Sequence, residues 1–161
     1  MLTRVGFGSD SHRFDPHRPL VLGGVRLAES AGLAGHSDAD VLTHAVIDAL
    51  LGAAALGDIG RHFPPSDPQW ADADSQDLLR RTVALLARHG YRVGNVDATV
   101  VAERPRLAPH LPAMRAQLAQ ALAVSLDAVS VKATTAEGMG ALGRSEGVLA
   151  QAIAQIIQDA P

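Results

Sequence analysis

The longest apolar-rich stretch of the sequence, residues 41–56, is interrupted by Thr43, His44 and Asp48. Crossing a bilayer takes about 20 consecutive apolar residues, so this stretch is too short and too polar to do so. It predicts instead a helix that is buried inside a folded domain. Apolar residues make up 47% of the chain but aromatic residues only 3%, so the core around this helix must consist mainly of Ala, Val, Leu and Ile.

The size and charge of the chain narrow the class of protein further. Its 161 residues predict one domain, residues 1–161. Cysteine is absent, which excludes disulfides, thiolate metal ligands and cysteine nucleophiles and fits a reducing compartment. The formal net charge is −3 without a long run of Lys or Arg, so no nucleic-acid partner is expected. Residues 1–8 show no signal peptide, and we expect a soluble, cytoplasmic protein with no membrane partner.

Periodicity and turn residues predict the other elements. Ser37 or Asp38 is expected to cap the long helix, because a side-chain oxygen there accepts an unpaired backbone N–H, and Gly57 is expected to follow its end. The segment 148–159 is rich in helix formers, and propensity alone favours a helix there. The order of elements predicts an α+β domain with helices on one face of the sheet. The expected elements before 148 are a strand at 3–8, a hairpin at 19–27 around Gly23-Gly24, helices at 40–56, 75–89 and 109–123, and strands at 95–102 and 128–134.

One candidate metal site combines the end of the first strand with the long helix. Asp10 and His12 lie two residues apart, so in extended chain their side chains point to the same side. With His44 they form an Asp/His₂ set that suits zinc and leaves a fourth position open. The same residues are also consistent with a strand-end Asp in a turn and a His packed on a helix. Asp48, one turn beyond His44, either orients that imidazole or is an exposed carboxylate.

Two further motifs flank the long helix. His36-Ser37-Asp38 precedes it, and a helix N-terminus attracts phosphate through its free N–H groups and its dipole. Ordinary capping explains the same residues. Gly57-Asp58-Ile59-Gly60 follows the helix and permits close approach of the backbone to a ligand, although an ordinary turn accounts for it equally well.

The stretch 131–137 ends a strand with a cation, two hydroxyls and a carboxylate. Lys132 and the Thr residues could donate to a diphosphate, and Glu137 could hold a bridging Mg²⁺. Alternatively, Lys132 is a solvated charge at a sheet edge. Residues 138–143 formally match the dinucleotide fingerprint GxGxxG, but too little chain follows for the helix, strand and acidic residue that this fingerprint requires. No Walker A motif or GxSxG nucleophile elbow occurs.

Together, the order and spacing of these motifs resemble the methylerythritol cyclodiphosphate synthase family along nearly the whole chain. So many matches in the same order make chance an implausible explanation. The matching stretches are Gly8-Ser9-Asp10-Ser11-His12, Leu22-Gly23-Gly24-Val25, Gly35-His36-Ser37-Asp38-Ala39-Asp40, residues 48–60, Asp74-Ser75, Gly94-Asn95-Val96-Asp97, Val131-Lys132-Ala133-Thr134-Thr135 and Gly143-Arg144-Ser145-Glu146-Gly147.

The resemblance implies a fold and an assembly. The fold is a ferredoxin-like β-α-β-β-α-β sandwich with helices on one face of a mixed sheet, and the assembly is a homotrimer with active sites at subunit interfaces. The last element of the family is a strand, so we expect a strand at 148–159, because tertiary context can override propensity. Arg144 and Glu146 match residues that line a central trimer cavity able to hold an isoprenoid diphosphate.

The resemblance also implies the bound cations. Asp10, His12 and His44 would hold Zn²⁺, and Glu137 would hold Mg²⁺ or Mn²⁺ beside the substrate diphosphate.

Catalytic and substrate-binding residues follow from the same resemblance. His36 and Thr135 match positions that stabilise the transition state. Two departures from the family pattern concern this site: Pro65 replaces an acidic residue that relatives often carry, and Ala141 replaces a usual aromatic. The substrate-binding residues implied are Ser37, Asp58, Ile59, Gly60, Phe63, Asp67, Ala102, Pro105, Leu107, Lys132, Thr134, Ala136, Ala141 and Arg144.

The reaction implied is a lyase reaction in the non-mevalonate route to isoprenoid precursors. It converts 4-diphosphocytidyl-2-C-methyl-D-erythritol 2-phosphate to 2-C-methyl-D-erythritol 2,4-cyclodiphosphate and CMP. Two alternatives use the same residues: a metal-dependent phosphohydrolase that delivers water, and a non-catalytic trimer that binds a metal or ligand. Asp58 and the polar residues of 132–137 provide more polar material than a structural metal requires, which favours a catalytic site.

Overall fold

The computed structural model describes residues 2–158, apart from the side chains of Ala28 and Glu29. Five strands form one mixed sheet in the order β2-β1-β5-β3-β4. Within the described part of the chain, only the β3–β4 pair is parallel, and the other three pairs are antiparallel. The strands are β1 (Leu2–Leu22), β2 (Val25–Leu33), β3 (Arg92–Val101), β4 (Val129–Thr134) and β5 (Gly147–Gln158).

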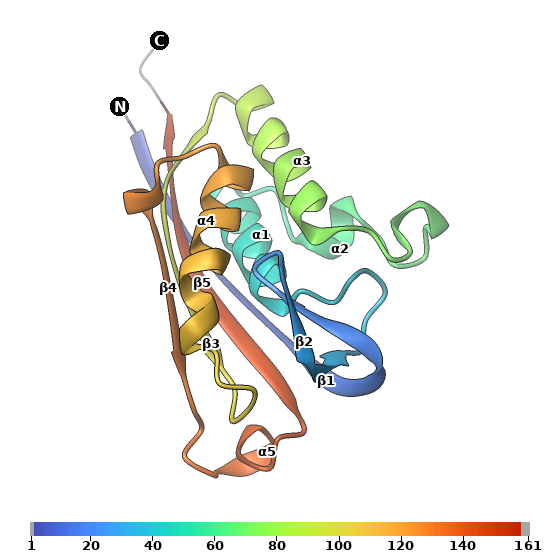
Figure 1. The fold of residues 1–161 in the computed structure, drawn as a ribbon. Helices are drawn as coiled ribbons and strands as arrows, with labels where there is room; N and C mark the ends of the chain where they lie inside the picture. The colour runs from blue at the N-terminus through green and yellow to red at the C-terminus, as the bar shows by residue number, and fades with distance from the viewer. Residues whose placement is uncertain (1, 159–161) are drawn as a thin grey trace.

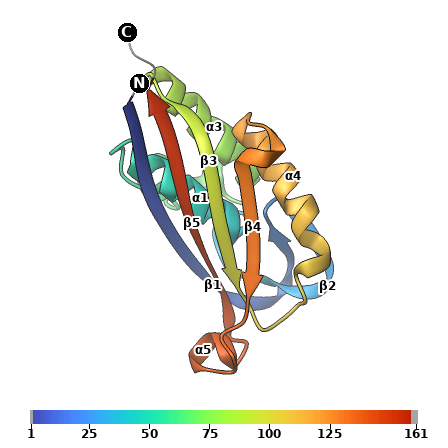
Figure 2. The ribbon, with the colours of Figure 1, turned by 90° about the vertical axis from the view of Figure 1, so that its left-hand side faces the viewer.

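Helices cover one face of this sheet, and Figures 1 and 2 show α1, α3 and α4 on the same side of the strands. α1 lies against β1 and β5, and α4 lies against β4. None of the helices in residues 2–158 has the length and apolarity that a membrane crossing requires. The helices are α1 (Val41–Ala53), α2 (Ile59–His62), α3 (Ser75–Arg88), α4 (Leu111–Leu122) and α5 (Gly140–Gly143), with 3₁₀ turns at Pro68–Trp70, Ala108–His110 and Leu126–Ala128.

The helix α1 approaches β1 more closely than most side chains would allow. A Cβ atom added at Gly6 would lie 2.0 Å from the carbonyl oxygen of Ala49, and one at Gly8 would lie 2.0 Å from that of Ala45. The helix-facing positions of the neighbouring strand β5 are also small, because Ala150, Ala152 and Ala154 are buried there. Small residues on both strands therefore bring α1 close to the sheet, and this contact fixes where the residues after Gly8 lie relative to the helix.

The start of α1 corrects one prediction. The N-cap is Asp40, not Ser37 or Asp38. Its fully buried carboxylate accepts from the backbone N–H of Thr43 and also from those of Gly23 and Gly24, at 3.0, 2.8 and 2.7 Å. Burial raises the pKa of Asp40 above its ordinary value, although these hydrogen bonds oppose the change. One carboxylate thus ties the β1–β2 turn to the helix, a long-range role that local capping rules do not reveal.

The other element predictions are confirmed in kind, with shifted ends. The helix at 75–89, the hairpin around Gly23-Gly24 and the strand in place of a helix at 148–159 are all present, although Asp159 lies outside the described residues. α1 ends at Ala53 instead of near residue 56, because the chain turns at Ala55 with φ of +58°. The first strand does not stop at residue 8 but continues through residues 9–22, pairing with β5 as far as Arg13.

The mixed α+β class with helices on one face is confirmed, but the predicted β-α-β-β-α-β order is wrong. Apart from β2, the described strands and helices follow the order β1, α1 to α3, β3, α4, β4, α5 and β5. A parallel neighbour needs a crossover connection, and α4 provides it between β3 and β4. The last strand then returns to the middle of the sheet, between β1 and β3.

Candidate active site

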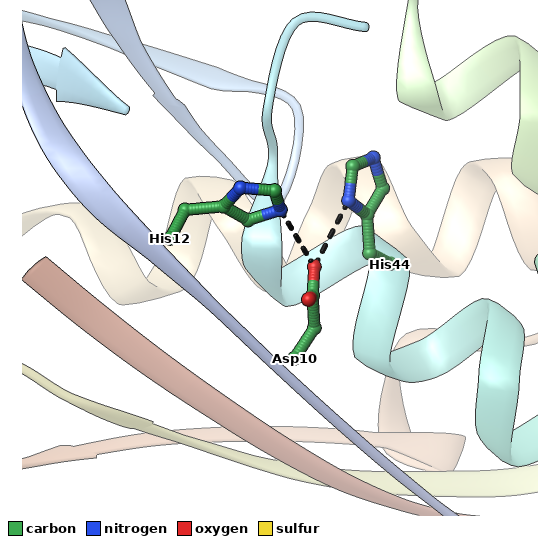
Figure 3. A group of neighbouring side chains, drawn as sticks. All are labelled: Asp10, His12 and His44. Atoms are coloured by element: carbon green, nitrogen blue, oxygen red, sulfur yellow. Dashed lines mark hydrogen bonds and ion pairs between the residues drawn. The ribbon is translucent and has the colours of Figure 1, made fainter. Parts of the chain in front are cut away.

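Three potential metal ligands converge between β1 and α1 (Figure 3). Asp10 and His12 come from the helix-facing side of β1, and His44 comes from the first turn of α1. Oδ2 of Asp10 lies 2.9 Å from Nε2 of His12 and 3.0 Å from Nδ1 of His44. One ligand atom from each residue lies within 4.8 Å of the others. The structure therefore contains the candidate Asp-His-His metal group that the sequence predicted.

The hydrogen bond on the outer side of His12 supports this interpretation. Its Nδ1 lies 2.5 Å from the carbonyl oxygen of Ala34, which can only accept, so Nδ1 carries a proton. In the neutral ring, the lone pair of Nε2 then faces the carboxylate of Asp10, so two hydrogen-bond acceptors face each other without a proton between them. A divalent cation bound by both atoms removes this repulsion, and three N and O ligands with room for a fourth suit zinc. These three ligand atoms fit a metal ion. Which metal binds there is part of the proposal below.

Without a metal, the cluster is held by its own charges. Burial alone would raise the pKa of the Asp10 carboxyl, but hydrogen bonds and charge from His12 and His44 outweigh it and hold that pKa far below its usual range. The hydrogen bond to Asp10 raises the pKa of His12 above its ordinary value, against the effect of burial. The cluster therefore keeps Asp10 ionised next to positive charge. A bound cation would supply positive charge at the same place.

A cavity of about 280 Å³ opens beside these ligands. Five of the predicted catalytic and substrate residues line it, while Asp58 and Asp67 do not. Asp58 caps α2 by accepting from the N–H of Arg61, and Asp67 accepts from that of Gln69, both at 3.0 Å. The lining residues are Asp10, His12, His44, His36, Ser37, Ile59, Gly60, Phe63, Pro65, Trp70 and Leu78.

The remaining predicted residues belong to the segments 102–107 and 132–144, which follow β3 or run from β4 through α5 (Figure 1). The N–H of Ala102 donates to the carbonyl oxygen of Thr134 at 3.0 Å, which joins residues 102–107 to the end of β4. A carboxylate oxygen of Glu103 then accepts from the N–H groups of Ala136 and Gly138, at 2.8 and 3.3 Å. The structure thus brings together two segments in which the resemblance places substrate-binding residues.

Individual residues in this second region differ in what they can offer a ligand. Ala102 and Leu107 are buried, so only their backbone can reach a ligand. Lys132 pairs with Asp97 at 2.6 Å and Arg144 pairs with Glu146 at 2.8 Å, so both cations already have partners. Thr135, Glu137 and Ala141 are exposed, whereas Pro105 follows a cis peptide bond and is half-buried. Their binding roles stay predictions.

The two regions do not meet within one chain. Among the described residues, those that line the cavity beside Asp10 include none from 102–107 or 132–144. The cavity beside Asp10 is therefore lined by only one of the two sets of predicted substrate residues.

Several contacts at the site were missed or misjudged from the sequence. Asp48 does not reach His44; one of its oxygens accepts from the N–H of Ile59 at 2.8 Å. The partners of His44 Nε2 are instead the hydroxyls of Ser75 and Ser37, at 2.9 and 3.1 Å. Ser75 belongs to one of the family-like stretches, which was the only signal available for it. Nothing in the local sequence marked Glu103, Trp70 or Leu78 as site residues.

Comparison with known proteins decides the family. The model of the YgbB family matches residues 3–157. The chain belongs to this family. It is 61% identical over 154 residues to a 2-C-methyl-D-erythritol 2,4-cyclodiphosphate synthase of Thermosynechococcus vestitus, covering 96% of each chain. A synthase of the same name from Salinibacter ruber is 62% identical over 153 residues, which cover 95% of this chain and 98% of that protein.

A solved structure leads to the same family. The CDP-bound form of 2C-methyl-D-erythritol-2,4-cyclodiphosphate synthase superimposes with a TM-score of 0.88 at 34% identity, covering 96% of this chain and all of that one. The resemblance predicted from the motifs is therefore confirmed for this member of the YgbB family.

Proposed function

We propose that the chain is a single catalytic domain that converts 4-diphosphocytidyl-2-C-methyl-D-erythritol 2-phosphate to 2-C-methyl-D-erythritol 2,4-cyclodiphosphate and CMP. The observation that carries this proposal is the convergence of Asp10, His12 and His44 on the wall of a cavity. The identity of about 60% to synthases of this name along nearly the whole chain supports the same reaction. We place this reaction in the cytoplasm, within the non-mevalonate route to isoprenoid precursors.

The reaction needs no covalent enzyme residue. An oxygen of the substrate's 2-phosphate forms a bond to the β-phosphorus, the bond between that phosphorus and the bridging oxygen breaks, and CMP leaves with that oxygen. Because both reacting groups are anionic, the protein must hold them in line, and good orientation can remove roughly 7–11 kcal/mol of such a barrier. His36 and Ser37, on the cavity wall at the entrance to α1, are suited to hold the methylerythritol phosphate end.

Two cations belong to this proposal. Asp10, His12 and His44 would hold Zn²⁺, and Glu137 would hold Mg²⁺ or Mn²⁺ at the diphosphate. When bound, such ions screen phosphate charge and polarise the β-phosphate. Thr135 donates to a carboxylate oxygen of Glu137 at 3.3 Å, so its hydroxyl is positioned beside the proposed ligand. Ala136 and the residues beside it, whose loop is fixed by the bonds to Glu103, would then hold the CDP part.

An exposed apolar face supports assembly as a homotrimer. Val5, Phe7 and Ile153 point away from the helices and are 66%, 61% and 51% exposed, and Phe7 pairs in register with Ile153. Large apolar residues gathered on one face of a sheet mark an interface more often than a free surface. Assembly through this face would bring residues 132–144 of one copy to the cavity of the next, with Arg144 beside a central cavity that could take an isoprenoid diphosphate.

The test of the reaction is ³¹P NMR of the purified protein with the CDP-methylerythritol 2-phosphate substrate, Mg²⁺ and Zn²⁺. We expect paired, coupled diphosphate resonances together with CMP. Release of inorganic phosphate would establish the hydrolase alternative. An unchanged spectrum from folded, metal-loaded protein would favour the non-catalytic alternative and would direct attention to Pro65 and Ala141.

Assembly has its own test. Phe7→Asp places a charge on the apolar face, so we expect this variant to sediment as a monomer while the unmodified protein sediments as a trimer. Leu126→Asp is the matched control, because Leu126 is 50% exposed but lies in a 3₁₀ turn before β4. A trimer that survives the Phe7 change, or a monomeric unmodified protein, would contradict the proposed interface.

A further inference from the structure

The outer nitrogen of His44 faces a hydrogen-bonded chain of two side chains that the proposed reaction does not use. Nε2 of His44 lies 2.9 Å from the hydroxyl oxygen of Ser75, the first residue of α3, which is fully buried. The same hydroxyl donates to Oδ1 of Asp38, and the backbone N–H of Ser75 donates to Oδ2 at 3.0 Å. His44, Ser75 and Asp38 thus form a continuous relay that ends on a carboxylate.

Counting protons fixes the direction of this relay. An ionised carboxylate only accepts, so the single hydroxyl proton of Ser75 is committed to Asp38. The hydroxyl oxygen can then only accept from His44, which requires a proton on Nε2. In the neutral ring, Nδ1 is therefore left with its lone pair, and Nδ1 is the atom that lies 3.0 Å from Asp10. The relay holds His44 in the tautomer that a metal needs.

The surroundings of Asp38 keep the relay in place. Asp38 also accepts from the N–H of Asp40 at 3.2 Å, and its own N–H donates to the carbonyl oxygen of Ala73 at 3.1 Å. These bonds join the loop before α1 to the start of α3. Ser37 also lies near Nε2, at 3.1 Å, but its oxygen accepts from the N–H of Ala39 and its proton is not committed to a carboxylate. Ser75 is therefore the residue that imposes the direction.

We propose that Ser75 and Asp38 are positioning residues that fix the tautomer of His44 and thereby raise the affinity of the site for a divalent cation. The proposal rests on the metal-binding part of the proposed function. Outer partners of metal-binding histidines typically change metal affinity by roughly 10–100-fold when removed. Because Asp38 acts only through Ser75, its effect on affinity should vanish once the hydroxyl is absent.

The experiment measures Zn²⁺ affinity by competition with a chromophoric chelator, independently of turnover. We expect Ser75→Ala to weaken binding by roughly 10–100-fold and Ser75→Thr, which keeps the hydroxyl, to restore most of it. Asp38→Asn should weaken binding in the unmodified background but add nothing in the Ser75→Ala background. The control is Thr82→Val, which removes another buried hydroxyl from α3, one that donates to the carbonyl oxygen of Leu78 at 2.9 Å.

The outcomes separate this proposal from the proposed function. Tight Zn²⁺ binding by the unmodified protein with an undiminished Ser75→Ala variant would overturn the relay and leave the metal site intact. Additive effects of the Ser75 and Asp38 changes would also overturn it, because Asp38 would then act without Ser75. Failure of the unmodified protein to bind Zn²⁺ would overturn both. If Ser75→Ala does not fold, Ser75→Thr and Asp38→Asn keep the test: the first must retain affinity and the second must lose it.

Discussion

The cavity beside Asp10 and the segment 132–144 are both assigned to one substrate, but the protein holds them in different ways. The cavity lies between a strand and a helix that pack backbone to backbone, and its ligands have outer partners that fix their orientation. The segment follows an edge strand, is largely exposed, and is fastened to residues 102–107 by the carboxylate of Glu103. The proposed cation site is thus built into the core, whereas the proposed nucleotide site, which would have to admit and release its ligand, is built on loops.

The largest effect that this comparison predicts is the loss of the metal ligand on α1. His44→Ala should weaken Zn²⁺ binding by more than the roughly 10–100-fold typical of an outer partner and should abolish turnover with it, while CDP affinity changes little. The control is His17→Ala, because His17 is an exposed histidine on the same strand as Asp10. Equilibrium dialysis with Zn²⁺ and the ³¹P assay measure both effects. Full activity with undiminished Zn²⁺ in the His44 variant would disprove the ligand assignment.

The next largest effect is expected from the close contact between α1 and β1, which positions the cavity. A Cβ at position 8 would lie 2.0 Å from the carbonyl oxygen of Ala45, so Gly8→Ala must push α1 away from β1. We expect a loss of about 1–3 kcal/mol in the free energy of unfolding, together with weaker Zn²⁺ binding.

The matched control is Gly52→Ala, one residue before the end of α1. Its Cβ would meet nothing nearer than the carbonyl oxygen of Phe7 at 3.9 Å. Replacing an exposed helical glycine by alanine should stabilise the protein by roughly 0.5–1 kcal/mol. Urea titration of both variants checks the pair, and equal effects at the two positions would show that the close approach does not hold the helix.

A smaller and more selective effect is expected in the nucleotide region. Glu103→Ala removes the acceptor of two backbone N–H groups, and charge-assisted bonds of this kind are worth about 1.5–3 kcal/mol. CDP affinity, measured by calorimetry, should therefore fall roughly tenfold or more while Zn²⁺ affinity is unchanged. Glu103→Gln keeps one carbonyl oxygen and should retain most of the affinity. A parallel loss of Zn²⁺ binding would mean that the two regions are coupled and not independent.

The smallest effect concerns the exposed pair between Asp97 and Lys132, on the sheet face away from the helices. The hydrogen bond from Lys132 lowers the pKa of Asp97, so the pair stabilises the fold above the unfolded pKa of an aspartate and loses that effect as pH falls through the folded value. In the Phe7→Asp background, where this face is expected to be free of partner subunits and both side chains are exposed, Asp97→Asn should cost less than about 1 kcal/mol near pH 7 and nothing in strong acid. Denaturant titrations at both pH values test this, and a pH-independent cost would assign the effect to something other than charge.

Local patterns in the sequence predicted the elements that are regular along the chain. The buried helix, the hairpin and α3 follow from apolar period, turn residues and glycine stops. Strand β5 did not, since its helix-forming residues are extended only because it lies between β1 and β3; the family resemblance predicted it. The cap at Asp40 was missed because two of its partners, Gly23 and Gly24, belong to a different turn.

The candidate site divides in the same way. Asp10 and His12 could be paired from a two-residue spacing, and residue type made His44 a candidate third ligand. That the three meet depends on how β1 packs on α1, and before the structure only the resemblance supported it. Ser75 lies 31 residues from His44 in the chain, and no local pattern joins them. Asp48 is the carboxylate one turn beyond His44 on the same helix and was a candidate to orient its imidazole. Its side chain instead accepts a hydrogen bond from the N–H of Ile59.

The alternation along β1 has a consequence for how the sequence can vary. Gly6, Gly8, Asp10 and His12 face α1, while Val5 and Phe7 face the opposite side. Substitutions on one side leave the other side in place, but inserting or deleting one residue between 5 and 12 would exchange the two sides over part of the strand. The metal ligands would then point outward and the apolar residues would meet the helix. Sequence change in this stretch can therefore proceed by replacement but not by a change of length, unless a bulge restores the alternation.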